Sequence, residues 1–148
     1  VDFLGNVSLL SHIGPNQMFA ESYALTKTPM YVYVRAIEDC TIQFLDVQAL
    51  EKSPEIKNQM IQILSNKNKM LSQHIFHISN KTIRNKVLSY LSFMKLETQN
   101  STFKIPFDRQ QMADYLNVER SALSKELSKM KSEGLIDYHK NTFIVYSI

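Results

Sequence analysis

One segment of this chain, residues 108–136, limits its possible folds more than any other. It reads DRQQMADYLNVERSALSKELSKMKSEGLI. Asp108, followed three positions later by Gln111, is typical of the capping box that begins a helix. Asn117 is one of the few residues other than glycine that accept a left-handed backbone, and Gly134 suits the position just after a helix end. The segment therefore predicts two short helices joined by a tight turn.

Each predicted helix has one apolar face. In the first helix this face consists of Met112, Tyr115 and Leu116, and in the second helix, which begins near Glu119, it consists of Leu123, Leu127 and Met130. The opposite face of the second helix has short or cationic side chains: Ser121, Ser124, Lys125 and Ser128, with Arg120 on its flank. Arginine and lysine suit guanine edges, and serine can bond to any base or to a phosphate.

A hairpin is predicted after the second helix, with strands over residues 135–138 and 143–148 and a turn at Lys140-Asn141. Two helices followed by such a hairpin form a winged helix-turn-helix, which places one helix in the major groove of DNA. Lys129 and Lys131 lie further along that helix and are expected to contact phosphates, as is Ser128. A helical hairpin with a solvated serine and lysine face is the alternative, and periodicity alone does not separate the two. The capping and the hairpin favour DNA binding.

The sequence QQMADYLNVERSALSKELSKMKSEGLI closely resembles the C-terminal domain of the Crp–Fnr family of bacterial transcription regulators. The family usually has glycine where Asn117 stands, and often arginine where Lys125 stands, so paired contacts to guanine are weakened here. The resemblance implies that Arg120, Ser121, Ser124 and Lys125 read bases. It also implies that Arg109, Gln110 and Gln111 hold the DNA backbone.

The rest of the chain resembles part of the family's sensor domain, through LLSHIGPNQMFAES and YVYVRAIEDCTIQFLDV. The expected fold class is α+β, with a partial antiparallel β-roll over residues 1–52, a dimerisation helix over 53–78 and the winged helix-turn-helix over 79–148. Because the family's earlier strands are missing and Val1 stands first, we expect a fragment or a processed chain. Turns are expected at Gly5-Asn6 and Gly14-Pro15-Asn16. Strands are expected over residues 30–34 and 41–46, with Cys40 buried beside them.

The resemblance places a possible effector pocket at Ala20, Glu21, Ser22, Met30 and Tyr31. Family members that bind cyclic nucleotides have glycine, glutamate, a small hydroxyl residue and an arginine for the phosphate. Here the glycine position is Ala20, the arginine position is Met30, and Tyr31 adds bulk. Losing the phosphate's cation predicts that this chain does not bind cyclic AMP in the usual way. No cofactor is evident, and the effector is unknown.

A long helix is predicted from Ser53 or Pro54 to about Ile78, with Ser79-Asn80 capping the next helix at a hinge. Its apolar stripe consists of Ile56, Met60, Ile63, Leu64, Leu71 and Ile75. A narrow stripe favours a partner helix, and the resemblance implies a parallel two-fold homodimer. An ordinary helix packed on its own domain is the alternative. His74 and His77 could share a metal, but without a third ligand nearby they are expected to be interface or surface residues.

Charge is uneven along the chain. Residues 79–148 contain 11 lysines and arginines against 7 acidic residues, whereas residues 1–78 contain 6 against 7. The basic half is therefore the one that would meet phosphates. The expected partners are double-stranded DNA, a second copy of the chain and RNA polymerase, with no membrane and a cytoplasmic location. No nucleophile–base set, phosphate loop or metal cluster suggests an enzyme. The alternative function is a ligand-sensing or protein-interaction module whose winged helix does not bind DNA.

Overall fold

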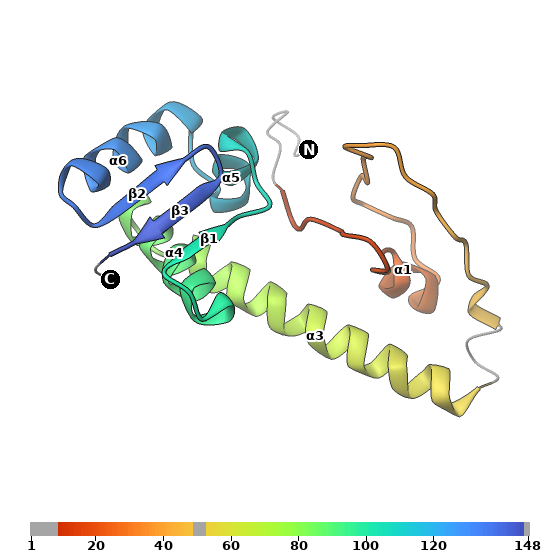
Figure 1. Cartoon of the computed structure of the whole chain (residues 1–148). Helices are drawn as coiled ribbons and strands as arrows, with labels where there is room; N and C mark the ends of the chain where they lie inside the picture. The colour runs from red at the N-terminus through yellow and green to blue at the C-terminus, as the bar shows by residue number, and fades with distance from the viewer. Residues whose placement is uncertain (1–8, 49–52, 147–148) are drawn as a thin grey trace. The chain divides into compact units, whose positions relative to one another are not determined.

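The computed structural model describes residues 9–48 and 53–146 of the chain (Figure 1). These residues belong to two compact units. One contains residues 13–71, and the other contains residues 72–146 together with residues 9–12. Helices and a small antiparallel sheet make up the described chain, which confirms the α+β class.

The first unit contains a short helix, α1 (Glu21–Thr26), between two residues with left-handed backbone, Ala20 and Lys27. The predicted turn at Gly14-Pro15-Asn16 is confirmed, whereas that at Gly5-Asn6 lies outside the described residues. The strands predicted over residues 30–34 and 41–46 were wrong, because no strand forms within residues 9–48. Their β-branched and aromatic side chains favour strands, but a strand also needs a hydrogen-bonded neighbour. Tyr33 and Phe44 are 88% and 92% exposed instead.

The long helix α3 (Pro54–Ile78) has the predicted bounds, with proline at its first position. The next helix, α4 (Ile83–Thr98), is capped by Thr82, whose hydroxyl accepts a hydrogen bond from the Asn85 amide at 3.1 Å. The prediction that Ser79-Asn80 caps α4 was wrong. The Asn80 side-chain amide instead donates to the carbonyl oxygens of Phe76 and His77, so it caps the end of α3.

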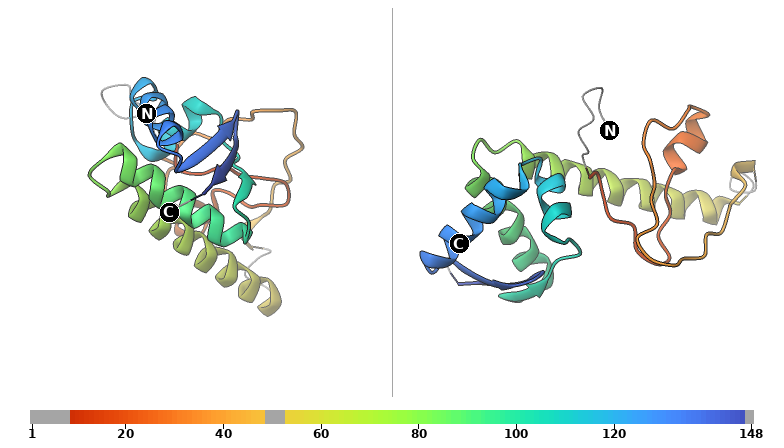
Figure 2. Two further views of the ribbon diagram at one scale, coloured as in Figure 1. Left: turned by 60° about the vertical axis from the view of Figure 1, so that its left-hand side comes forward. Right: turned by 90° about the horizontal axis from the view of Figure 1, so that it is seen from above.

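The C-terminal unit continues with β1 (Thr102–Lys104), α5 (Arg109–Leu116), α6 (Arg120–Ser132), β2 (Ile136–His139) and β3 (Thr142–Val145). The three strands form an antiparallel sheet in the order β1-β3-β2, with β2 and β3 joined at Lys140 and Asn141. β1 and β3 pack against α4, and β2 packs against α6 (Figure 2). The hairpin after the second helix is therefore confirmed over its described residues.

A single apolar core holds this unit together. Its buried side chains come from every helix and strand after α3, and those that are fully buried include Leu91, Met112, Leu116, Leu123, Leu127, Met130, Ile136 and Phe143. Burying one such side chain stabilises the folded state by about 1.5–3 kcal/mol relative to leaving it exposed. The three residues predicted to face inward on α6 are all fully buried, so the opposite face of that helix is turned outward.

Candidate nucleic-acid interface

The start of α5 is fixed by a capping box. The Asp108 carboxylate accepts from the Gln111 amide at 2.8 Å, and the Gln111 side-chain oxygen accepts from the Asp108 amide at 2.8 Å. Asn117 ends the helix with a φ of 50°, and its N–H returns to the carbonyls of Ala113 and Asp114. The predicted cap and the predicted left-handed turn are both confirmed. Together they set the angle at which α6 leaves the turn.

The C-terminal end of α5 is held by side chains from two other helices. His74 Nε2, near the end of α3, lies 2.7 Å from the Tyr115 carbonyl oxygen, and the His74 and Tyr115 rings stack at 4.2 Å. A carbonyl oxygen only accepts, so Nε2 carries the proton. The Lys86 ammonium of α4 donates to the carbonyls of Leu116 and Asn117, both at 3.2 Å. The last carbonyl oxygens of a helix have no hydrogen-bond partner within the helix, so cationic or N–H donors are favoured there.

His77 is the second buried histidine of α3. Its Nδ1 lies 2.7 Å from the Ser89 hydroxyl, while its Nε2 is buried without a hydrogen-bond partner among the described residues. Burial, and then the proximity of His74, lower the pKa of His77 below 6.5. The two histidines bond to different groups, and the described residues contain no cluster of His, Cys, Asp or Glu that could hold a metal. They tie the last turns of α3 to the helices that follow.

The N-terminus of α6 is capped by Glu119. Its carboxylate accepts from the amides of Ser121 and Ala122 at 3.0 and 2.8 Å, and the Ser121 hydroxyl also donates to it. The bond from that hydroxyl is the main cause of the lowered pKa of Glu119, which keeps the carboxylate charged. The proton of the Ser121 hydroxyl is therefore held within the helix cap.

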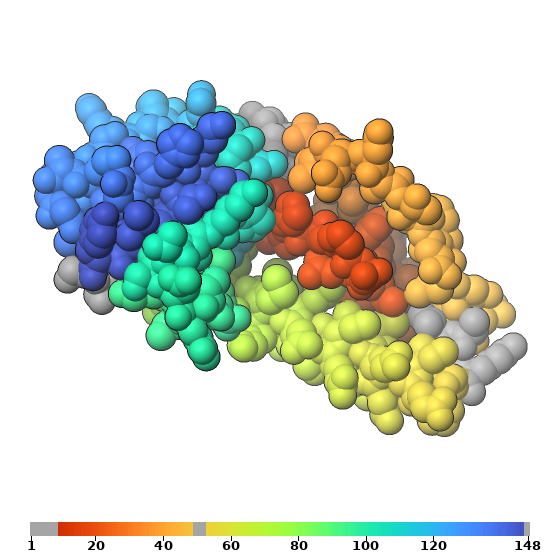
Figure 3. All heavy atoms as spheres, in the orientation of Figure 1, coloured from red at the N-terminus to blue at the C-terminus, as the bar shows by residue number. Residues whose placement is uncertain are grey.

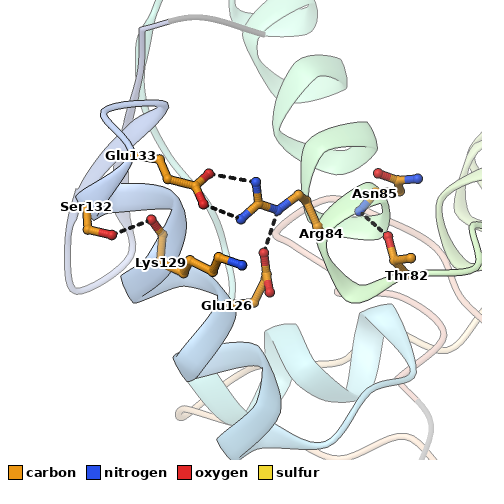
Figure 4. Close-up of polar contacts among 7 residues, drawn as sticks. All are labelled: Thr82, Arg84, Asn85, Glu126, Lys129, Ser132 and Glu133. Carbon is orange, nitrogen blue, oxygen red and sulfur yellow. Dashed lines mark hydrogen bonds and ion pairs between the residues drawn. The ribbon is translucent and has the colours of Figure 1, made fainter.

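The predicted base-reading residues lie on the outer surface of α6. Arg120, Ser121 and Lys125 are exposed and Ser124 is half-buried. Figure 3 shows the α6 side chains, in light blue, at the surface of the C-terminal unit. Ser128 is exposed on the same outer side, and its hydroxyl donates to the Ser124 carbonyl at 3.0 Å. Lys129 is exposed on the flank that carries Glu126 and Glu133 (Figure 4). A continuous polar and cationic surface thus runs along the helix.

The flank of α6 that faces α4 carries the acidic residues. The Arg84 guanidinium forms a two-pronged contact with Glu133 at 2.6 and 2.9 Å, and its Nε lies 2.6 Å from Glu126 (Figure 4). These contacts, led by the bond to Glu133, raise the pKa of Arg84, and the same bond lowers that of Glu133. Sequence reasoning missed this contact, since 42 and 49 residues separate Arg84 from its partners.

The opposite flank of α6 faces the hairpin. Lys131 forms an ion pair with Asp137 of β2, and its ammonium lies 5.5 Å from the centre of the Tyr138 ring. Arg109 lies over the same ring at 5.0 Å and over Phe143 at 5.7 Å, and burial lowers its pKa. Both cations were expected to contact DNA phosphates. Each is engaged within the protein, so a phosphate contact would have to share it with the hairpin.

The other two residues of α5 that were expected at the DNA backbone also have partners inside α5 and its cap. The Gln110 side-chain amide donates to Asp114 at 2.8 Å, while the Gln111 oxygen belongs to the capping box. Gln110 is exposed and Gln111 is half-buried. Both residues lie in the first turn of α5.

The five residues of the expected effector pocket do not form one enclosed group. Glu21 is buried in α1, where its carboxylate lies 2.7 Å from the Lys67 ammonium of α3, and Lys67 also donates to the Met18 carbonyl at 2.5 Å. Ser22 is exposed, and Met30 and Tyr31 are 43% and 81% exposed. Ala20 has a φ of 64°, a conformation that favours glycine. Cys40 is exposed, so its predicted burial was wrong.

The apolar residues of the helix predicted to form a dimer are covered to different extents. Met60 is buried and Ile56 and Ile63 are half-buried, whereas Leu71 and Ile75 are 49% and 62% exposed. Leu64 is half-buried. Among the described residues, no helix combines the length and the apolar character needed to cross a membrane.

Comparison with known proteins gives consistent matches. The family described as the Crp-like helix-turn-helix domain matches residues 85–147. The probable transcriptional regulator flp of Lacticaseibacillus casei is 28% identical over 137 residues, covering 92% of this chain and 57% of that protein. The transcriptional activator protein FnrL of Cereibacter sphaeroides is 26% identical over 98 residues, covering 60% of this chain and 40% of that protein. The chain thus spans about half the length of these curated relatives.

Two solved structures share the fold. FixK2 from Bradyrhizobium japonicum has a TM-score of 0.56 at 15% identity, covering 68% of this chain and 52% of that one. TTHB099 from Thermus thermophilus, described as a transcriptional regulator of the CRP family, has a TM-score of 0.55 at 18% identity, covering 70% and 54%. The matches agree with the resemblance seen in the sequence: residues 85–147 match the Crp-like helix-turn-helix domain, and the chain is similar to transcription regulators of the Crp–Fnr family.

Proposed function

We propose that this chain regulates transcription as a homodimer that binds an inverted-repeat operator, with α6 of each copy in the major groove. The observation that carries the proposal is the outer face of α6. It presents Arg120, Ser121 and Lys125 to solvent while Leu123 and Leu127 anchor the helix in the core. Two such helices, related by a two-fold axis, would read half-sites about 34 Å apart.

Three exposed cations of α6 divide into two expected roles. Arg120 and Lys125 lie where side chains reach base edges, so replacing either should relax sequence preference by about 1–3 kcal/mol at one base pair. Lys129 lies nearer the C-terminal end of α6 and is exposed. Its loss should weaken binding to all sequences alike and reduce the salt slope of the logarithm of affinity by about 0.9.

The test starts by selecting preferred duplexes from a random pool. Fluorescence anisotropy then measures the affinity of Arg120→Ala, Lys125→Ala and Lys129→Ala for the selected duplex and for single-base variants, at several salt concentrations. Lys69→Ala, an exposed lysine of α3, is the matched control and should behave as the parent chain. Equal losses for all three variants on every duplex would contradict the division of roles. Failure of the parent chain to bind duplex DNA would overturn the function.

We further propose that the chain does not respond to cyclic AMP. The support is the chemistry of the expected pocket: Lys67 already neutralises Glu21, and Met30 replaces the cation that would bind the phosphate. Calorimetric titration of the chain with cyclic AMP should give no binding heat. Micromolar binding with one ligand per chain would overturn this part of the proposal, and DNA binding would remain to be judged separately.

A further inference from the structure

One series of residues on α3, which shares Leu64, Leu71 and Ile75 with the predicted apolar stripe, has a regular spacing. Its residues alternate in steps of three and four positions: Ile61, Leu64, Asn68, Leu71, Ile75 and Ile78. Ile61, Leu71 and Ile75 are 61%, 49% and 62% exposed, and Asn68 is exposed between them. Met60, four positions before Leu64, flanks this series and is buried. Leu64 and Ile78 are half-buried, and we call the whole series the α3 seam.

Steps of three and four positions give an average period of 3.5 residues, the repeat of a coiled coil. In this repeat Ile61, Asn68 and Ile75 occupy the a positions, and Leu64, Leu71 and Ile78 occupy the d positions. Isoleucine, which is branched at Cβ, at the a positions with leucine at the d positions favours a coiled coil of two parallel helices over one of three or four. The α3 seam therefore fits a second copy of the same helix, running in the same direction.

Asn68 is the one polar residue of the seam, and it stands at its centre with an isoleucine seven positions away on each side. In a parallel, in-register pair, position a of one helix faces position a of the other. Each Asn68 amide would then bond to its counterpart. A shift by one heptad would place Asn68 against Ile61 or Ile75 and leave two amides unpaired between apolar side chains. An unrelated apolar helix would leave Asn68 unpaired in the same way.

We propose that Asn68 pairs with Asn68 of a second copy, and that this polar pair fixes the register and direction of the α3 seam while limiting its strength. The proposal rests on the homodimer of the proposed function and adds what determines its alignment. A polar residue at a single a position commonly specifies register and oligomeric state at some cost in affinity. The dimer would thus be selective rather than maximally tight.

The first test measures self-association of the full chain by sedimentation equilibrium. Asn68→Val should tighten association about tenfold or more and allow species larger than dimers, because the polar specification is removed. Asn66→Val makes the same chemical change on the opposite side of α3 and should leave the dissociation constant unchanged. If Asn68→Val leaves association unchanged or weakens it, with circular dichroism showing intact helix, the proposal is overturned.

The second test reports direction and register. In a Cys40→Ser background, Ile61→Cys should form a disulfide-linked dimer with itself under mild oxidation by oxidised glutathione. In an antiparallel pair centred on Asn68, residue 61 would instead meet residue 75. Preferential cross-linking of Ile61→Cys to Ile75→Cys in a mixture would therefore overturn the proposal. Adding Asn68→Val to the self-linking variant should slow its cross-linking relative to Asn66→Val, because registers become mixed.

The two proposals fail in different ways. A parallel, in-register dimer that binds no duplex DNA leaves the α3 seam standing and removes the proposed function. If the chain stays monomeric at every concentration at which it remains in solution, yet binds DNA, the proposal for the α3 seam is overturned and DNA binding is left intact.

Discussion

His74 and Tyr115 join the end of α3 to the end of α5, through a 2.7 Å hydrogen bond and a ring stack at 4.2 Å. His74 belongs to the same compact unit as the helix-turn-helix, although it lies on the long helix. The last turns of α3 are thus part of the body that positions α5 and α6.

Replacing His74 should destabilise the C-terminal unit. His74→Ala removes the donor to the Tyr115 carbonyl and the stacked ring, and the unpaired carbonyl costs about 1–3 kcal/mol. Urea denaturation followed by circular dichroism measures the change in unfolding free energy. His139→Ala, an exposed histidine of β2, is the control and should change it by less than about 0.5 kcal/mol. Equal stability of the two variants would contradict this role for His74.

Stability should fall with acidification because of His77. Its pKa is lowered in the folded state by burial and by His74, so the unfolded chain binds a proton more readily. The stability that depends on neutral His77 is complete above the unfolded value of 6.5 and is lost as the pH falls from there through the lowered folded value. Denaturation at about pH 7.5 and about pH 5.5 measures the loss. His77→Phe keeps a ring and should show a smaller difference; an unchanged difference would contradict the assignment.

Arg84 should act on DNA binding without touching DNA. Its fork to Glu133 and its bond to Glu126 hold α6 against α4. Arg84→Met should lower the denaturation midpoint and weaken binding to all duplexes alike. Arg84→Lys should recover only part of the loss, because an ammonium cannot form the two-pronged contact. A double-mutant cycle with Glu133→Gln measures the coupling. Additive effects of the two changes would show that the Arg84–Glu133 contact is not the cause of the lost stability and binding.

Asn117 tests the turn between α5 and α6. Its φ of 50° is left-handed, which glycine adopts without strain. Asn117→Gly should therefore alter the unfolding free energy by less than about 1 kcal/mol, whereas Asn117→Val should cost about 1–2 kcal/mol or more. Thermal and urea unfolding check both. A tolerated valine would mean that the turn can adopt another conformation.

The sequence predicted the helix-turn-helix well because its signals are local. The Asp108–Gln111 cap, the turn at Asn117 and the inward face of Leu123 and Leu127 each depend on residues within one or two turns of helix. Contacts between distant segments carry no such signal, and so the Arg84 fork and the His74 bond were missed.

The wrong predictions for the first unit also arose because contacts between distant segments leave no local signal. Residues 30–34 have the composition of a strand, but a strand also requires a neighbour, which composition does not supply. On α3, apolar spacing identified a stripe but did not separate residues that are buried within the chain, such as Met60, from exposed ones such as Ile75. Only burial made that distinction.

The sequestered acids of α6 have a consequence for how the protein first meets its target. Glu126 and Glu133 are bound on one flank by Arg84, while Arg120 and Lys125 remain exposed. A chain with a formal charge of only +3 can therefore present a locally positive front. Electrostatic attraction would orient this surface toward a polyanion before the two make contact. Added salt would screen the attraction and lower the association rate.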